Sequence, residues 1–472
     1  MTAAQAAARP VPGCAPDSSF FGHPRGLAYL AFTEAWERFS YYGMSALVVL
    51  YMVNQLLLPG HIENVVGFAG FRGAIEGLFG PLSTQALASQ IFGFYSGFVY
   101  FTPIIGGWIG DRLGQRSAVV LGALSMSGGH LAMAFDQSFL LALLLLIIGS
   151  GLLKGNISAQ VGGLYPVEDE ARRTRGFAIF STGINFGAVA GPLLCGFLGA
   201  RYGWHIGFGA AAVFMLGALA TYLSGYRHLP AKVERKTSGP VAMTKDDRTI
   251  VAALIAVMII NVPAQVAYYQ LANVLPVWLQ QHASMNAGTF EIPIPWYQSI
   301  DALFSIVTLP LLFALWRWQG RGSGREPTEL WKIGTGSLIS AGANLILVAA
   351  IVVSPGKVLW VWPFLYCAVQ GIAFMYFWPP FLALVSRASP AKINATMMGS
   401  AFLVLFVANN LIGFIGTFYE QMGPLAFWSM HAGIGVFGWL LIMIFGRPLA
   451  RILEPRDVQS LRPAAMTEEV VP

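Results

Sequence analysis

Charged residues are scarce in this chain of 472 residues. Lys, Arg, Asp and Glu together make up 11% of the sequence, and 56% of the residues are hydrophobic. A soluble domain carries roughly 25% charged residues, so the composition excludes an ordinary soluble protein. Apolar stretches of about 20 residues, long enough to cross a bilayer, recur along nearly the whole chain. The sequence therefore predicts an all-α polytopic membrane protein.

Cysteine and histidine are also rare. The three cysteines, Cys14, Cys195 and Cys367, lie at unrelated spacings, and there are only seven histidines. We therefore predict no disulfide framework, no metal site and no cofactor. The chain also has no nucleophile–base pattern and no phosphate-binding loop, which argues against an enzyme. Its first 26 residues are polar and rich in Pro and Gly, and we expect them to form a short tail rather than a signal peptide.

Polar breaks divide the chain into twelve predicted spans, at about 26–55, 88–110, 116–135, 138–160, 175–199, 203–225, 248–281, 293–318, 331–353, 359–386, 394–419 and 424–446. The longest polar link lies between the sixth and seventh spans. We expect an N-terminal tail (1–25), a six-helix bundle (26–225), a linker (226–247), a second bundle (248–446) and a C-terminal tail (447–472). This plan is typical of transporters that bind substrate between two pseudo-symmetric bundles. The long loop at 56–87 has room for an interfacial helix.

The distribution of basic residues predicts the orientation. All but five of the 28 Lys and Arg residues lie in tails and loops on the side of the termini. Because Lys and Arg concentrate on the cytoplasmic side, we expect both termini in the cytoplasm. The net charge of +6 is then a topology signal and a contact with anionic lipid of the bilayer, and we expect no nucleic acid partner.

Five charged residues fall inside the predicted spans. Glu34, Glu37 and Arg38 share one face of the first span, Lys154 lies in the fourth and Asp301 in the eighth. A lone charge in mid-membrane costs about 2.5–3.5 kcal/mol, so such groups usually pair at functional sites. Three acids against two bases leave one surplus acid, which a proton can neutralise without leaving a base unpaired. The cluster therefore predicts a proton carrier; the alternative is a purely structural ion network, which is a costly way to hold helices together.

A glycine-rich charged motif separates the second and third spans. It reads G-W-I-G-D-R-L-G-Q-R and contains Gly107, Asp111, Arg112, Gly114 and Arg116. This motif resembles the G-x-x-x-D-R-x-G-x-R signature of the major facilitator superfamily. The glycines allow two helices to meet closely, and we expect the acid and the two bases to form a charge latch at the cytoplasmic helix ends. The alternative is an ordinary positive-inside loop.

Several further motifs occur in order along the chain. They are E-x-x-E-R-F-x-Y-Y-G at 34–43, G-x-G-x-x-K-x-N-x-S at 149–158, F-x-x-x-I-N-x-G at 180–187, W-Y-Q-S at 296–299, and a proline at 379 followed by SRASP at 386–390. Over residues 26–420 the chain thus resembles the proton-dependent oligopeptide transporter family. The resemblance implies proton-coupled import of small peptides by alternating access, with Glu34, Glu37 and Arg38 in proton coupling and Lys154 linking them to the substrate site.

The same resemblance implies a minimal prokaryotic form in the bacterial inner membrane, because the linker and outer loops are too short for the insertions of other relatives. We expect a monomer driven by the proton gradient. It also implies a substrate site, although aromatic residues in spans often serve only packing. The candidate substrate-binding residues are Tyr41, Tyr42, Ser45, Tyr95, Lys154, Asn185, Tyr269, Gln270, Asp301, Phe374 and Ala401.

Five of these candidates depart from the family pattern. Ser45 stands where the family has a second base, and Tyr269 and Phe374 stand where it has acids that face the cargo. Ala401 replaces a pocket tryptophan, while Asp301 replaces an asparagine. The resemblance implies that the base and the seventh-span acid would pair across the bundles, and we expect Tyr268 and Tyr269 to close that gate by hydrogen bonds instead. Peptide-end recognition is therefore rebuilt.

Three functions remain open at this point. The first is proton-driven import of di- and tripeptides or peptide-like solutes. The second keeps the coupling but carries a modified, cyclic or end-blocked peptide, or a cationic or aromatic solute held by Asp301 beside Phe374. The third is a membrane sensor that does not transport.

Overall fold

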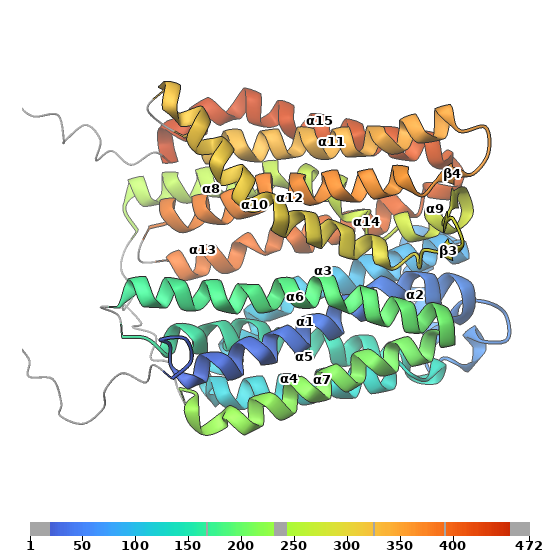
Figure 1. Cartoon of the computed structure of the whole chain (residues 1–472), viewed down its shortest axis with the longest axis horizontal. Coiled ribbons are helices and arrows are strands. Elements are labelled where there is room, and N and C mark those ends of the chain that lie inside the picture. The colour runs from blue at the N-terminus through green and yellow to red at the C-terminus, as the bar shows by residue number, and fades with distance from the viewer. Residues whose placement is uncertain (1–18, 167–168, 231–242, 324–325, 391–392, 454–472) are drawn as a thin grey trace, which may run out of the picture.

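The computed structural model describes residues 19–166, 169–230, 243–323, 326–390 and 393–453 (Figure 1). Long helices run nearly parallel to one another along the longest axis of the molecule. The described chain begins and ends at the left of Figure 1, which we call the tail end, and we call the opposite end the far end. Residues 1–18 of the predicted N-terminal tail, 231–242 of the predicted linker and 454–472 of the predicted C-terminal tail lie outside the described residues.

The described residues of the first half of the chain form seven α-helices. They are α1 (Arg25–Tyr51), α2 (Phe68–Phe79), α3 (Thr84–Leu113), α4 (Gln115–Ala132), α5 (Phe139–Gly163), α6 (Glu170–Tyr202) and α7 (Trp204–Gly225). A π-helix, η1 (Met52–Leu56), continues α1, and short 3-10 helices η2 (Ile62–Asn64), η3 (Asp136–Ser138) and η4 (Tyr226–His228) lie in the connections. The loop predicted at 56–87 contains η2 and α2, so it does contain a helix, as its length allowed.

In the second half, eight α-helices lie within the part of the chain that the structure describes. They are α8 (Lys245–Tyr269), α9 (Leu275–His282), α10 (Trp296–Ser323), α11 (Glu329–Val353), α12 (Val361–Ala388), α13 (Asn394–Ala401), α14 (Leu403–Gly416) and α15 (Tyr419–Leu453). Four two-residue strands pair at the far end: β1 (Ala283–Ser284) with β4 (Val358–Leu359), and β2 (Asn286–Ala287) with β3 (Phe290–Glu291). They are too small to change the all-α class.

Each of the twelve predicted spans contains a helix, and two of them are broken. The seventh span consists of α8 and α9 with a turn between them, and the eleventh consists of α13 and α14. Among the described residues, nine helices are long and apolar enough to cross a membrane by length and composition. The prediction of an all-α polytopic membrane protein is therefore confirmed.

Side-chain caps set several of the helix starts. The Ser83 hydroxyl accepts from the Ala86 amide at the start of α3, and Thr328 accepts from the Trp331 amide at the start of α11. Thr244 and Asp247 satisfy each other's backbone amides in a capping box before α8. Each cap satisfies amide groups that the first helical turn leaves without partners.

Two hydrophobic cores divide the molecule. The larger consists mainly of residues from α1 to α7, and the second of residues from α8 to α15. In Figure 1 the elements up to α7 occupy the lower half of the view and the later ones the upper half. We call these halves the N-bundle and the C-bundle.

Two side-chain hydrogen bonds join α10 of the C-bundle to α6 of the N-bundle toward the far end. Trp296 Nε1 donates to the Leu193 carbonyl at 2.9 Å, and Ser299 Oγ donates to the Val189 carbonyl at 2.7 Å. On the other side of the molecule α3 crosses α14 so closely that a Cβ added to Gly93 would lie 2.6 Å from the Gly413 Cα. These contacts close the far end of the interface between the bundles.

Candidate functional site

The charged residues of α1 form one buried ion cluster. Arg38 Nε lies 2.6 Å from a Glu37 oxygen and 2.9 Å from a Glu34 oxygen. Glu37 is fully buried, and the other two side chains are less than 10% exposed. Spacings of three and four residues place all three groups on one helix face. One guanidinium thus bridges two carboxylates, as expected for charges that persist inside a span only when paired.

Tyr41 connects this cluster to Lys154 of α5. The Arg38 guanidinium carbon lies 5.7 Å from the centre of the Tyr41 ring, and Lys154 Nζ lies 4.7 Å from the same centre. Lys154 Nζ is also 5.0 Å from the centre of the Tyr100 ring. This buried ammonium has no hydrogen-bond partner within the described chain. Cation–π contacts hold Lys154 in place while its donors stay available for an anionic ligand.

Asp301 of α10 is the charged residue predicted inside a span of the C-bundle. Its Oδ2 accepts a hydrogen bond from the Tyr268 hydroxyl at 2.7 Å, while the buried Oδ1 has no partner among the described residues. The Tyr268 ring stacks on Phe374 with 5.3 Å between ring centres and meets Tyr269 edge to face at 5.0 Å. The carboxylate therefore lies against an aromatic wall and keeps one oxygen for a cationic ligand.

Tyrosines join the two bundles near these charges. Tyr269 of α8 shares a side-chain hydrogen bond with Tyr100 of α3. Tyr42 meets Tyr41 edge to face with 5.2 Å between ring centres. The buried Tyr95 hydroxyl and Ser45 Oγ have no hydrogen-bond partner in the described part of the chain. A contact between two uncharged tyrosines thus crosses the interface between the bundles. We expected Tyr268 and Tyr269 to close this gate, and Tyr269 is the residue that reaches the other bundle.

Two other predicted substrate residues lie in packed surroundings. Gln270 is fully buried, and its Nε2 donates to the Ile412 carbonyl of α14 at 3.2 Å. Ala401 is fully buried in the C-bundle core at the end of α13. In this conformation both side chains hold helices together, and neither is open to solvent.

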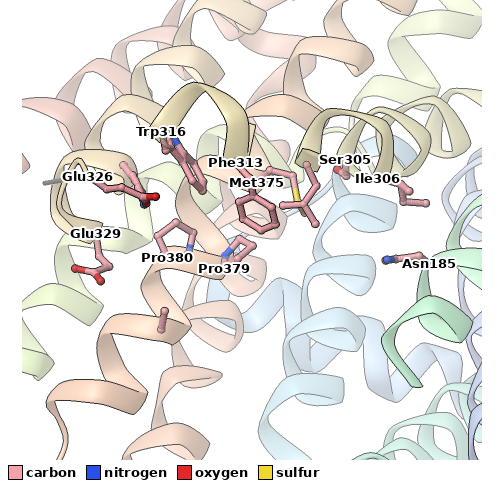
Figure 2. A pocket seen from close by; sticks show the side chains of 13 residues that line it. Asn185, Ser305, Ile306, Phe313, Trp316, Glu326, Glu329, Met375, Pro379 and Pro380 are labelled. Atoms are coloured by element: carbon pink, nitrogen blue, oxygen red, sulfur yellow. The ribbon is translucent and has the colours of Figure 1, made fainter. Parts of the chain in front are cut away.

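A cavity of about 450 Å³ lies mainly among α10, α11 and α12, and of the predicted substrate residues Asn185 lines it. Figure 2 shows Asn185 of α6 at one end and Glu326 and Glu329 at the other, with residues of α10 and α12 between them. Ser305, one helical turn after Asp301, lines the cavity together with apolar side chains such as Phe313 and Met375. The cavity thus leads from the level of Asp301 toward the tail end.

Ion pairs border the tail end of this cavity. Lys332 Nζ lies 3.5 Å from a Glu326 oxygen and 4.0 Å from the centre of the Trp316 ring. Glu329 accepts from Arg387 of α12 at 2.9 Å. Both ion pairs belong to the C-bundle, and they lie where the cavity reaches the tail end.

The glycine-rich charged motif lies at the tail end, between α3 and α4. Gly114 has φ +87°, a conformation that glycine adopts without strain, and it turns the chain between the two helices. Arg116 donates to the Leu229 carbonyl after α7, and the Arg112 guanidinium lies 3.6 Å above the Trp108 ring. Gln115 Nε2 is 3.5 Å from an Asp111 oxygen, and Gly107 has open space around it. The two arginines thus contact a carbonyl and a ring.

One residue of the site escaped the sequence prediction. Tyr100 contacts Lys154 from one side and Tyr269 from the other, so it lies at the centre of the arrangement. It belongs to the stretch F-Y-S-G-F-V-Y-F, in which aromatic residues follow one another closely. No local pattern separates this tyrosine from neighbours that only pack.

Comparison with known proteins identifies the family. The sequence profile described as the Major Facilitator Superfamily matches residues 30–417. The chain belongs to the Major Facilitator Superfamily. Among superfamily proteins, it is 29% identical to "Uncharacterized transporter YclF" of Bacillus subtilis, over 91% of this chain and 95% of that protein. It is 28% identical to a "Di-/tripeptide transporter" of Lactococcus lactis subsp. cremoris, over 93% of this chain and 98% of the other.

Solved structures of superfamily members agree with this assignment. A mutant of peptide transporter POT in complex with alafosfalin has a TM-score of 0.81 and 26% identity, over 93% of this chain and 98% of the other. The predicted facilitator fold and membership of the proton-dependent oligopeptide transporter family are confirmed. The protein is a transporter and not an enzyme.

Proposed function

We propose that the protein is a proton-coupled symporter that imports di- and tripeptides or peptide-like solutes by alternating access. One observation carries the proposal: a buried ammonium without a hydrogen-bond partner, Lys154, belongs to the N-bundle, and a carboxylate with one unpartnered oxygen, Asp301, belongs to the C-bundle. A peptide with free ends carries one charge of each sign, so it satisfies both groups. The names of the relatives, which describe di-/tripeptide transport, support this cargo.

In this proposal the peptide carboxylate pairs with Lys154 and the peptide ammonium pairs with Asp301. Hydrogen bonds to charged groups contribute about 1.5–3 kcal/mol each, so both ends matter for affinity. The aromatic wall formed by Tyr268, Tyr269 and Phe374 would exclude water from the bound ammonium. This arrangement assigns recognition of the two peptide ends to different bundles.

The proton would bind to the surplus acid of the α1 cluster, with Glu37 as the carrier. Arg38 is shared by Glu34 and Glu37, so protonating Glu37 leaves the arginine with one carboxylate partner. This change of charge acts on Tyr41, which contacts both Arg38 and Lys154. In this proposal Lys154 binds the cargo, so the proton and the cargo influence each other. Cargo and proton together would favour the inward-facing state, because each binds the two states with different affinity.

We further propose that both tails face the cytoplasm, so that the cavity of Figure 2 opens inward. The basic residues concentrated on that side support this orientation. The protein would then work as a monomer in the bacterial inner membrane, driven by the proton gradient without a cofactor.

Reconstitution tests the whole proposal. Proteoliposomes with an acidic exterior should accumulate Ala-Ala above its external concentration, and a protonophore should abolish the accumulation. The variant Glu37→Gln should bind Ala-Ala but fail to accumulate it, with an equal amount of protein in the membrane. Full protonophore-sensitive accumulation by this variant would disprove the role of Glu37. Uptake of end-blocked peptides that Ala-Ala does not compete for would disprove the cargo.

A further inference from the structure

A second cluster of titratable side chains lies at the far end of the N-bundle. Asp136 of η3 accepts a hydrogen bond from the Tyr51 hydroxyl at 2.5 Å through Oδ1. His205 Nε2 lies 3.3 Å from the same oxygen, and His61 Nδ1 lies 2.9 Å from Oδ2. We call His61, Asp136 and His205 the His–Asp–His cluster. It lies apart from the α1 ion cluster, because Tyr51 ends the helix whose residues 34–38 carry those ions.

The cluster joins segments that are far apart in the sequence. His61 belongs to the loop before η2, Asp136 to the connection between α4 and α5, and His205 to the first turn of α7. The histidine side chains are 45% and 40% exposed, whereas Asp136 is 14% exposed. Protons can therefore reach both rings from solvent. Among the described residues no such group is arranged to hold a metal ion.

The π-helix η1 connects the cluster with the far-end contact between the bundles. Gln55 Nε2 lies 3.2 Å from His205 Nε2 and 3.5 Å from Asp136 Oδ2. Its neighbour Asn54 donates to Gln280 of α9 in the C-bundle at 3.1 Å. Two consecutive residues of one π-helical turn thus contact the two different bundles, and π-helical turns occur frequently at functional sites.

We propose that the His–Asp–His cluster is a proton-binding site, separate from the coupling site, that stabilises the closed far end. Histidine changes its charge between pH 5 and 8, and each protonated ring gains an attraction to the Asp136 carboxylate. Protonation turns His205 Nε2 into a donor, so the Gln55 amide loses that acceptor and keeps Asp136, which both charged rings hold in place. A fixed Gln55 restrains η1, so less conformational freedom is lost when Asn54 meets Gln280. Acidification at the far end therefore favours closure there.

No other acid competes with Asp136 for these rings in the described contacts. Tyr51 and Gln55 approach Asp136 as neutral donors. Glu63, the acid of the same loop, accepts from the Gly60 amide at 2.7 Å and stays with its own turn. The proposal assigns the pH response to His61 and His205, and the third histidine of this end, His282, lies in α9 of the C-bundle. With the orientation proposed above, an acidic exterior would help the loaded carrier to turn inward.

Distance measurements between two spin labels test this site. The labels replace Leu78 of α2 and Leu359 of β4, which are 80% and 60% exposed at the far ends of the two bundles. The three native cysteines become serine, and Glu37→Gln removes the proposed coupling site from the response. In lipid nanodiscs, lowering the pH from 8 to 5.5 should raise the ratio of short to long distances about threefold, the size expected for exposed ion pairs.

Two variants and one control decide the outcome. His61→Gln combined with His205→Gln should abolish the pH response, and Asp136→Asn should do the same while leaving both rings in place. Arg72→Gln, which breaks the exposed ion pair with Glu76 on α2, should leave the response unchanged. The proposal is overturned if the double histidine variant keeps the full response, or if the distances in the parent do not change with pH.

Discussion

The two bundles handle charge in different ways. In the N-bundle, Glu34, Glu37 and Arg38 form a compact ion cluster with Lys154 beside it. In the C-bundle, Asp301 stands without an ionic partner in the described chain, and its neighbours are aromatic rings. Pseudo-symmetric bundles of this fold need not share their chemistry. The comparison suggests that one bundle carries the proton while the other adapts to the cargo.

The remaining buried polar groups of the C-bundle are neutral. Ser340 Oγ donates to Gln370 Oε1 at 2.8 Å, and Asn344 Nδ2 donates to the Ala267 carbonyl at 3.1 Å. Satisfied neutral hydrogen bonds avoid the desolvation cost of buried ions. The C-bundle can thus change the residues that face the cargo, such as Phe374, without disturbing an ion network.

The largest expected effect comes from the N-bundle. Lys154→Ala should lower kcat/KM for Ala-Ala uptake about a hundredfold. The variant loses the charged hydrogen bond to the peptide carboxylate and the ammonium group beside the proposed proton site, and together these losses cost about 3 kcal/mol. Radiolabelled uptake in proteoliposomes measures this change. Lys357→Ala, at an exposed lysine of the far end, is the matched control and should transport normally. Unchanged uptake by Lys154→Ala would show that transport does not need the charged groups of the N-bundle, and the proposed division of roles between the bundles would be wrong.

An intermediate effect is expected in the C-bundle. Asp301→Asn should raise KM for Ala-Ala about tenfold, because the peptide ammonium loses about 1.5 kcal/mol of charged hydrogen bonding. Accumulation driven by the pH gradient should persist, since the proton site is intact. N-acetylated Ala-Ala, which lacks the ammonium, should bind the variant and the parent equally. If Asp301→Asn instead abolishes coupling, the proton site extends into the C-bundle.

The smallest effect is expected where the bundles meet. Tyr269→Phe removes one neutral hydrogen bond to Tyr100, worth about 0.5–1 kcal/mol, and should change the uptake rate about twofold to fivefold. Tyr376→Phe, at a buried tyrosine of α12 away from the interface, is the control. An effect of Tyr269→Phe as large as that of Lys154→Ala would show that the tyrosine contact takes part in coupling.

The sequence predicted the helices and the charged residues well, for physical reasons. Apolar stretches of membrane length and basic loops are strong local signals, and charges such as Glu37 and Asp301 stand out inside apolar helices. The breaks at Gln270 and between α13 and α14 were missed, because no charged residue marks either of them inside its predicted span. Tyr100 and the contact between Tyr51 and Asp136 depend on tertiary packing, which no local pattern encodes. The roles assigned to the site residues stay predictions.

The contact between Gly93 of α3 and Gly413 of α14 divides α3 into two arms of unequal length. Gly93 lies nine residues from the start of α3 and twenty from its end. At 1.5 Å per residue these arms measure about 13 and 30 Å. Because backbones touch there without side chains between them, tilting around this point is easier than sliding. A tilt of about ten degrees would then move the tail end of α3 by about 5 Å and the far end by roughly half as much, so a small movement at the far end goes with a wider opening at the tail end.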